Sequence, residues 1–188
     1  MDDTVADALR EATGADTCAF VAGCVERMAQ LFTGLRGGEP DREADVDFFL
    51  RVLDDLWDAD LPGGTFTVAM ESLEEFPELQ PGDEELVDVT DIYSFYAVLV
   101  ARHACTYRAS GDIENAVRSA HAALTAMGQL DRNIIASGFM NDERERQLRS
   151  ALSGREDGVS KIGLPQVRSV DQRVSLERLS AVRNRLTR

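Results

Sequence analysis

Apolar residues recur every three or four positions along most of this chain. The clearest case is a stripe of seven apolar side chains that begins at Phe20 and ends at Phe32. This spacing places the apolar side chains on one side of an α-helix, whereas a half-buried strand would alternate strictly. No segment shows a convincing strand pattern. The sequence therefore predicts an all-α protein, a bundle of about seven to eight helices.

Breaks in this pattern divide the chain into expected helices. They are predicted over residues 5–12, 16–32, 41–58, 65–76, 88–110, 112–137, 142–152 and 167–188. Gly and Pro residues mark the connections, and the short one at 61–64 makes its flanking helices antiparallel neighbours. The helix at 88–110 is apolar almost all round as far as Ala101, which predicts that it is the central, buried helix.

A length of 188 residues suits a single domain. Within it, residues 1–141 form an acidic helical bundle with 27 Asp and Glu against 9 Arg, and residues 142–188 form a basic helical extension with 11 Arg and Lys against 7 acids. A linker is expected at 153–166. The basic end has three open roles: docking on the acidic body of its own chain or of a second chain, a solvated tail, or binding to nucleic acid or a membrane surface.

Composition also restricts location and partners. The N-terminus lacks the basic and apolar regions of a signal peptide, and the longest apolar run, Ile92 to Ala101, is far shorter than the roughly 20 residues of a membrane span. The expected location is cytoplasmic. A net charge of −14 makes nucleic acid an unlikely partner for the body. The three cysteines have no CxxC spacing and are predicted to be buried free thiols.

No motif in the sequence carries a recognisable chemistry. The only histidines, His103 and His121, are not in the Glu-x-x-His units that a helical di-metal site requires. There is no GxSxG motif, and the glycine-rich segment 34–38 lacks the Lys-Ser/Thr of a phosphate-binding loop. We therefore predict no catalytic residue, no metal and no cofactor. A non-enzymatic protein is the preferred interpretation, and an enzyme remains an open alternative.

Acidic stripes on two neighbouring helices are the first candidate site. Their members are Asp54, Asp55 and Asp58 on one helix and Glu71, Glu74, Glu75 and Glu78 on the next. The best hypothesis is an interaction protein that binds a basic partner through this face, for example an immunity protein that neutralises a cationic toxin. The alternative interpretation is a solvated face that keeps the protein soluble.

Two further hypotheses remain open. A small-ligand-binding protein or enzyme would have its pocket beside the helix 88–110, at the polar side chains Tyr93, Tyr96, His103 and Tyr107. A regulatory homodimer would form if the basic end of one chain docked on the acidic body of the other.

Five segments, taken in order, resemble the successive helices of the YjaG-like family, a widespread bacterial family of uncharacterised, all-helical proteins. They are FVAGCVERM (20–28), FFLRVLDDLWD (48–58), FTVAMESLEEFPEL (66–79), DIYSFYAVLVARHA (91–104) and GDIENAVRSAHAAL (111–124). The resemblance covers roughly residues 16–137, and the Arg-rich end after Asn141 departs from it. It implies an all-α bundle and transfers no catalytic residue.

Overall fold

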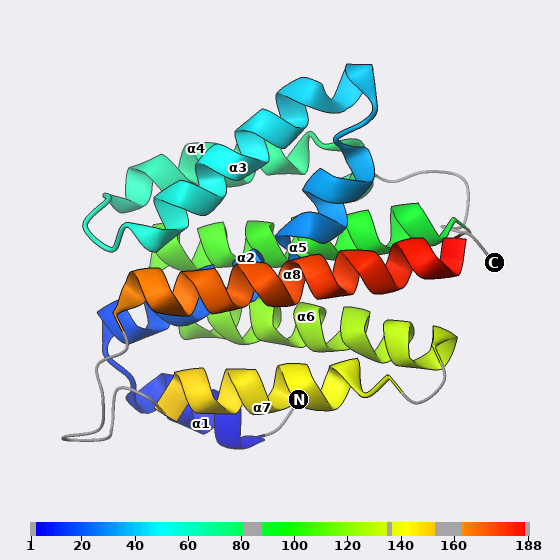
Figure 1. Cartoon of the computed structure of the whole chain (residues 1–188). Helices are drawn as coiled ribbons and strands as arrows, with labels where there is room; N and C mark the ends of the chain where they lie inside the picture. Colours follow the sequence, from blue (N-terminus) through cyan, green and yellow to red (C-terminus); the bar gives the residue numbers. More distant parts are fainter. Residues whose placement is uncertain (1–2, 81–87, 135–136, 153–162, 187–188) are drawn as a thin grey trace.

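The structure, a computed structural model, describes residues 3–80, 88–134, 137–152 and 163–186 (Figure 1). In these ranges it contains eight α-helices, two short 3-10 turns and no strand, which confirms the predicted all-α, single-domain bundle. The helices are α1 (Asp3–Glu11), α2 (Gly14–Arg36), α3 (Glu43–Trp57), α4 (Gly63–Glu74), α5 (Val89–Ser110), α6 (Ile113–Asn133), α7 (Phe139–Leu152) and α8 (Leu164–Leu186), with the 3-10 turns η1 (Pro40–Arg42) and η2 (Pro77–Leu79).

The helix at the centre of the bundle is α2. Every side chain from Phe20 to Ala29 is buried, and α3, α5, α6, α7 and α8 all pack against this helix. The sequence had indicated α5 for this place. One side of α5, which includes Phe95, Leu99 and Arg102, is only partly buried. An apolar surface all round a helix shows that it can be buried, but the packing of its neighbours decides how much of it is.

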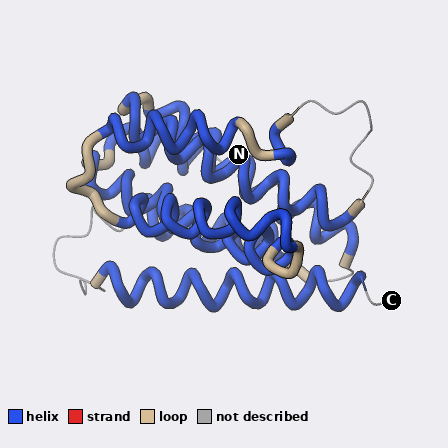
Figure 2. The backbone as a smooth tube through the Cα atoms, turned by 90° about the horizontal axis from the view of Figure 1, so that it is seen from above, coloured by secondary structure: helices blue, strands red, loops and turns tan. Residues whose placement is uncertain are grey.

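The other helices form layers around α2. Figure 1 shows α3 and α4 along one side of the bundle and α1 and α7 along the opposite side. The helix α3 packs on α2 and α5, whereas α4 packs on α5, so neither of the two has the other as its principal neighbour. In Figure 2, α8 runs along one edge of the bundle, where it packs on α2.

Side-chain caps explain several helix ends. Asp112 accepts a hydrogen bond from the backbone N–H of Glu114 at 3.1 Å and caps α6, as the sequence predicts. Gly111 ends α5 with a φ of 72°, a conformation that glycine adopts without strain. The start of α4 lies at Gly63, two residues before the predicted start at Thr65, and Pro62 occupies the capping position.

A carboxylate from α6 sets the start of α7. Asp131 accepts hydrogen bonds from the backbone N–H groups of Phe139 at 2.7 Å and Met140 at 2.9 Å. These bonds satisfy free amides of the first turn, so α7 begins at Phe139, three residues before the predicted start. The helix α6 correspondingly ends at Asn133 rather than near Ser137.

The basic C-terminal helix docks on the body of its own chain. It begins at Leu164, so the prediction of a linker that extends to residue 166 is wrong at its C-terminal end; Pro165 fits the first turn, where its missing N–H costs nothing. Residues 153–162 of the predicted linker lie outside the described residues. Both α7 and α8 pack on the bundle, which places the basic extension in the same domain.

The length and hydropathy of the described helices test whether any of them spans a membrane. None of them combines the length and apolar character needed to cross a bilayer.

Cys24 and Cys105 are buried free thiols, as predicted, whereas Cys18 is only partly buried. Burial raises the pKa of both Cys24 and Cys105 to about 12, which keeps these two thiols protonated at neutral pH.

Candidate functional site

The acidic residues predicted on α3 and α4 differ in exposure. Asp58, Glu71 and Glu75 are exposed, and Asp55 is half-buried. Asp58 accepts a hydrogen bond from the backbone N–H of Asp60 at 3.0 Å, which fixes the turn after α3. These carboxylates face solvent at the outer layer of the bundle, where a partner has access to them.

Two acids of the same stripes already have partners within the chain. The exposed Asp54 pairs with Arg168 at the start of α8, and Arg168 also donates to Glu26 at 2.9 Å. On α4, Glu74 pairs with Arg102 of α5. The basic C-terminal helix therefore reaches the edge of the acidic stripe on α3 and neutralises part of it.

Glu78 is not part of the exposed face, and its predicted outward position is wrong. The helix α4 ends at Glu74, and the 3-10 turn that begins at Pro77 directs Glu78 inward. There its side chain is 2% exposed and accepts hydrogen bonds from Arg42 at 2.6 and 2.9 Å and from Arg36 at 3.1 Å. Extending the i, i+4 pattern past the end of the helix caused the error.

Most of the charge of the molecule lies on one segment, which we name the acidic hairpin and define as residues 39–80. It holds 13 Asp and Glu against two Arg, a net charge of −11 out of −14 for the chain. Its exposed acids for which the described structure shows no ion pair are Asp41, Glu43, Asp47, Asp58, Asp60, Glu71 and Glu75. The acidic hairpin is therefore a strong local source of negative potential.

The polar side chains of α5 do not converge on one pocket. Tyr93 and Tyr107 are buried, whereas Tyr96 and His103 are partly exposed. The Tyr93 hydroxyl has no hydrogen-bond partner among the described residues, and burial raises its pKa. Burial, with help from Arg102 and Arg118, lowers the pKa of His103 to about 4. The imidazole is therefore neutral at pH 7.

An open hollow of about 420 Å³ lies on the other side of α5. Its lining residues are Glu74, Leu79, Phe95, Leu99 and Arg102. None of the four aromatic or histidine side chains expected to form a pocket contributes to it. The ion pair between Glu74 and Arg102 occupies its polar edge, so the two charged groups there already satisfy one another.

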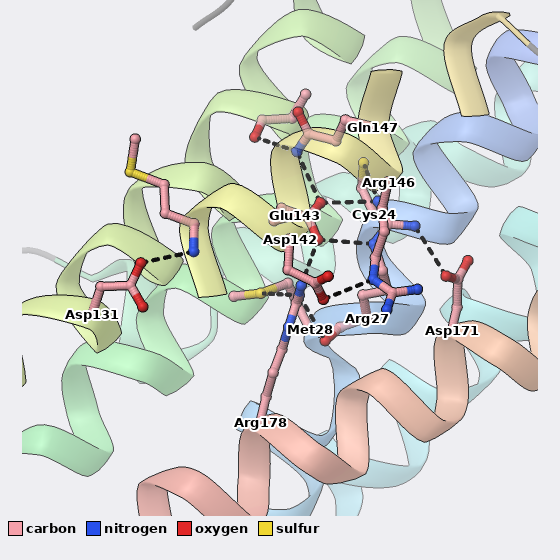
Figure 3. A network of polar contacts seen from close by, with 12 residues as sticks. Cys24, Arg27, Met28, Asp131, Asp142, Glu143, Arg146, Gln147, Asp171 and Arg178 are labelled. Atoms are coloured by element: carbon pink, nitrogen blue, oxygen red, sulfur yellow. Dashed lines mark hydrogen bonds and ion pairs between the residues drawn. The ribbon is translucent and has the colours of Figure 1, made fainter. Parts of the chain in front are cut away.

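A buried network of charged side chains, which we name the buried ion network, joins α2, α7 and α8 (Figure 3). Arg27 donates two hydrogen bonds to the two oxygens of Glu143, each 2.9 Å long, and one to Asp171 at 3.2 Å. Arg178 donates to Glu143 Oε2 at 2.5 Å. Gln147 completes the shell of Glu143 with a hydrogen bond of 2.9 Å to Oε1. The four charges cancel.

Burial and charge act against each other in this network. Burial raises the pKa of Glu143, but Arg27 and Arg178 outweigh it and hold the pKa at about 2. Asp171 differs, since burial raises its pKa and Arg27 offsets only part of the effect. Glu143 is therefore an obligatory anion of the fold. The arrangement is closed and neutral, which suits structure rather than the binding of an added ion.

Sequence reasoning missed this network because Arg27 lies more than 100 residues from Glu143 and Asp171 in the chain. One local signal does exist. Arg178 lies between Val174 and Val182 on the apolar stripe of α8, and Arg27 directly precedes Met28 of the apolar stripe of α2. An arginine at a core position of a helix needs a buried anion. The pattern therefore predicts that an acidic partner exists, but it does not identify which residue it is.

Groups of side chains suited to a metal ion are absent from the part of the chain that the structure describes. Among the described residues, the acids of α3 and α4 are therefore not arranged as a set of metal ligands. A search of family models, curated proteins and solved structures finds no match to this chain.

Proposed function

We propose that this is a non-enzymatic interaction protein that binds a basic protein through the acidic hairpin. The observation that carries the proposal is the concentration of 13 acids against two Arg in residues 39–80. The fold places this segment in an outer layer, on the α3 and α4 side of the bundle (Figure 1). Exposed carboxylates without an internal cation attract a positively charged partner and orient it before contact.

The chemistry of the remaining candidate groups favours binding over catalysis. The buried thiols Cys24 and Cys105, with pKa values of about 12, are not thiolates at neutral pH and so are poor nucleophiles. His103, with a pKa of about 4, is far from the value that suits a general acid or base near pH 7. An immunity protein that neutralises a cationic toxin is one concrete form of the proposed function.

A pair of charge-reversal variants tests the proposal. In the first, Glu71→Lys and Glu75→Lys reverse two exposed acids of the acidic hairpin; in the control, Glu145→Lys and Glu177→Lys reverse two exposed acids on α7 and α8. Both doubles change the net charge equally. Immobilised wild type and control should capture the same basic protein from a lysate of the source cells at low salt and lose it at high salt. The hairpin double should not capture it. Equal capture by the two doubles would contradict the proposal.

A further inference from the structure

The helix α8 is attached to the bundle through an unusually polar interface. Its buried residues are Asp171, Val174, Ser175, Arg178, Leu179 and Val182, of which half are polar or charged. The helix α4 also has one principal neighbour, yet its buried residues Phe66, Ala69 and Leu73 are all apolar. Both helices therefore bury three apolar side chains, but α8 has 23 residues and α4 has 12, so the hydrophobic attachment of α8 is the weaker of the two per residue.

The surface of α2 under α8 is shaped to receive it. Gly23, Arg27, Gln30 and Gly34 follow one another at helical spacing and form what we name the α2 strip. A Cβ at Gly34 would lie 2.4 Å from a methyl of Leu179, so the missing side chain makes room for that leucine. The backbone N–H of Gln30 also donates to the Ser175 hydroxyl at 2.9 Å.

Arginine side chains make many of the polar contacts between α8 and the rest of the bundle. Four of the five arginines of α8 donate hydrogen bonds to acceptors on the described body: Arg168 to Glu26 and Asp54, Arg178 to Glu143 and the carbonyl of Arg27, Arg183 to the carbonyl of Gly34, and Arg185 to the carbonyl of Asn133. A helix that fits this surface therefore has an apolar stripe and arginines at matching positions.

The buried ion network is divided unequally between α8 and the body. The two 2.9 Å hydrogen bonds from Arg27 to Glu143 join α2 to α7 and do not involve α8. The charges that α8 contributes, Arg178 and Asp171, would regain water if the helix left. Departure of α8 leaves the ion pair between Arg27 and Glu143, with Gln147, in place, so no lone charge stays buried within this network. Outside the network, Glu26 loses its ion pair with Arg168 and keeps a hydrogen bond of 2.8 Å from the indole N–H of Trp57.

We propose that α8 is a detachable strap, which separates from α2 as one unit while α1 to α7 stay folded. Its release uncovers a docking surface for a basic amphipathic helix of a partner protein. The surface consists of the α2 strip with Glu26 and Glu143. The class of partner rests on the proposed function, whereas the release of α8 does not depend on it. While α8 is docked on α2, it covers this surface and competes with the partner helix for it.

Hydrogen exchange of the full chain, followed by mass spectrometry under native conditions, tests the release. Peptides from α8 should exchange as a group, at least about tenfold faster than peptides from the interior of α2 and α5. Equal protection of α8 and of these two helices, both lost only on global unfolding, would overturn the strap.

Two matched variants of α8 sharpen this test. Arg178→Met removes the buried arginine and should speed the exchange of α8 by a further factor of about ten without changing α5. Arg173→Met removes an exposed arginine of the same helix and should change nothing. If Arg178→Met instead speeds the exchange of every helix equally, the network holds the whole bundle and α8 is not a separate unit.

A synthetic peptide of residues 163–188 serves as the probe for the docking surface. It should bind full-length Arg178→Met at least about tenfold more tightly than full-length wild type, because the weakened strap competes less. A peptide of the same composition in scrambled order is the control for non-specific attraction. Equal binding of the two peptides would reject the surface as a helix site. Glu71→Lys with Glu75→Lys should leave this binding and the exchange of α8 unchanged, which separates the strap from the acidic hairpin.

Discussion

At the scale of single residues, the bundle depends on one carboxylate. Glu143 is fully buried and receives hydrogen bonds from Arg27, Arg178 and Gln147. A buried ion pair adds little stability compared with an apolar pair of the same shape, but the loss of one member leaves its partner charged and unsolvated. The cost of disturbing this site is therefore much larger than its net contribution to stability.

Replacing Glu143 with Gln should lower the free energy of unfolding by about 3–5 kcal/mol, because the buried Arg178 would lose its carboxylate partner and Arg27 would keep only Asp171. Urea denaturation followed by circular dichroism measures the change. Glu145→Gln, an exposed acid on the same helix, is the control and should change stability by less than about 0.5 kcal/mol. Similar losses in the two variants would show that Glu143 is not the anchor of the network.

Acid should weaken the protein through the same residue. The pKa of Glu143 falls from an ordinary 4.5 to about 2 on folding, so its contribution is complete above pH 4.5 and is lost as the pH falls toward 2. The stability difference between wild type and Glu143→Gln should shrink over this range by on the order of 3 kcal/mol. The raised pKa of Asp171 acts in the opposite direction in the wild type. A difference that stays constant from pH 5 to pH 2 would contradict this assignment.

The individual residues show what a sequence can and cannot predict. Exposure of Asp58, Glu71 and Glu75 followed from helical spacing, since this pattern is local. The pairing of Arg27 with Glu143 could not be predicted, because it depends on how α7 is placed against α2. Glu78 was misplaced because the helical spacing of the acidic stripe was extended past the predicted helix end at residue 76, into the turn that begins at Pro77.

At the scale of the elements, local patterns located all eight helices but not their packing. The apolar stripe of α2 predicted a buried face, whereas the structure buries the helix all round between Phe20 and Ala29. The polar residues on its other sides, such as Arg27, are accommodated only because α7 and α8 supply anions. The boundary at Phe139 was missed because its cap, Asp131, comes from a different helix.

Close approach of α8 to α2 gives a prediction for glycine. Gly23→Ala should destabilise the protein by about 1–3 kcal/mol, since the new Cβ would meet Asp171 and Arg27, which the buried ion network fixes in place. Gly128→Ala on α6 meets only the flexible end of the exposed Met140 and should stabilise by up to about 1 kcal/mol through helix propensity. Thermal denaturation of the two variants compares them directly. The same sign of change in both would mean that the contact at Gly23 is not tight.

At the scale of the whole molecule, charge is distributed very unevenly. The acidic hairpin carries a net charge of −11, whereas α8 contains five Arg against two acids. Four of the five arginines of α8 contact the body, and Arg168 among them reaches Asp54 at the edge of the hairpin. Self-repulsion within the hairpin is thus only partly relieved by the rest of the chain.

Salt should therefore stabilise this protein at neutral pH. Screening of the acidic hairpin between about 10 mM and about 300 mM NaCl should raise the melting temperature by about 2–4 °C, which corresponds to roughly 1 kcal/mol for a chain of this size. The double variant Glu71→Lys, Glu75→Lys should show a smaller gain, because it carries less repulsion to screen. A melting temperature that falls with salt would mean that ion pairs outweigh repulsion overall.

The pairing of Arg27 with Glu143 also has a consequence for the order in which the chain folds during synthesis. Arg27 lies near the start of the chain and Glu143 in α7, so both are made before α8. Once α7 has been synthesised, Glu143 has both of its hydrogen bonds from Arg27 available, so this buried pair forms without α8. The last helix then adds Arg178 to Glu143 and supplies Arg168 as the ion-pair partner of Glu26.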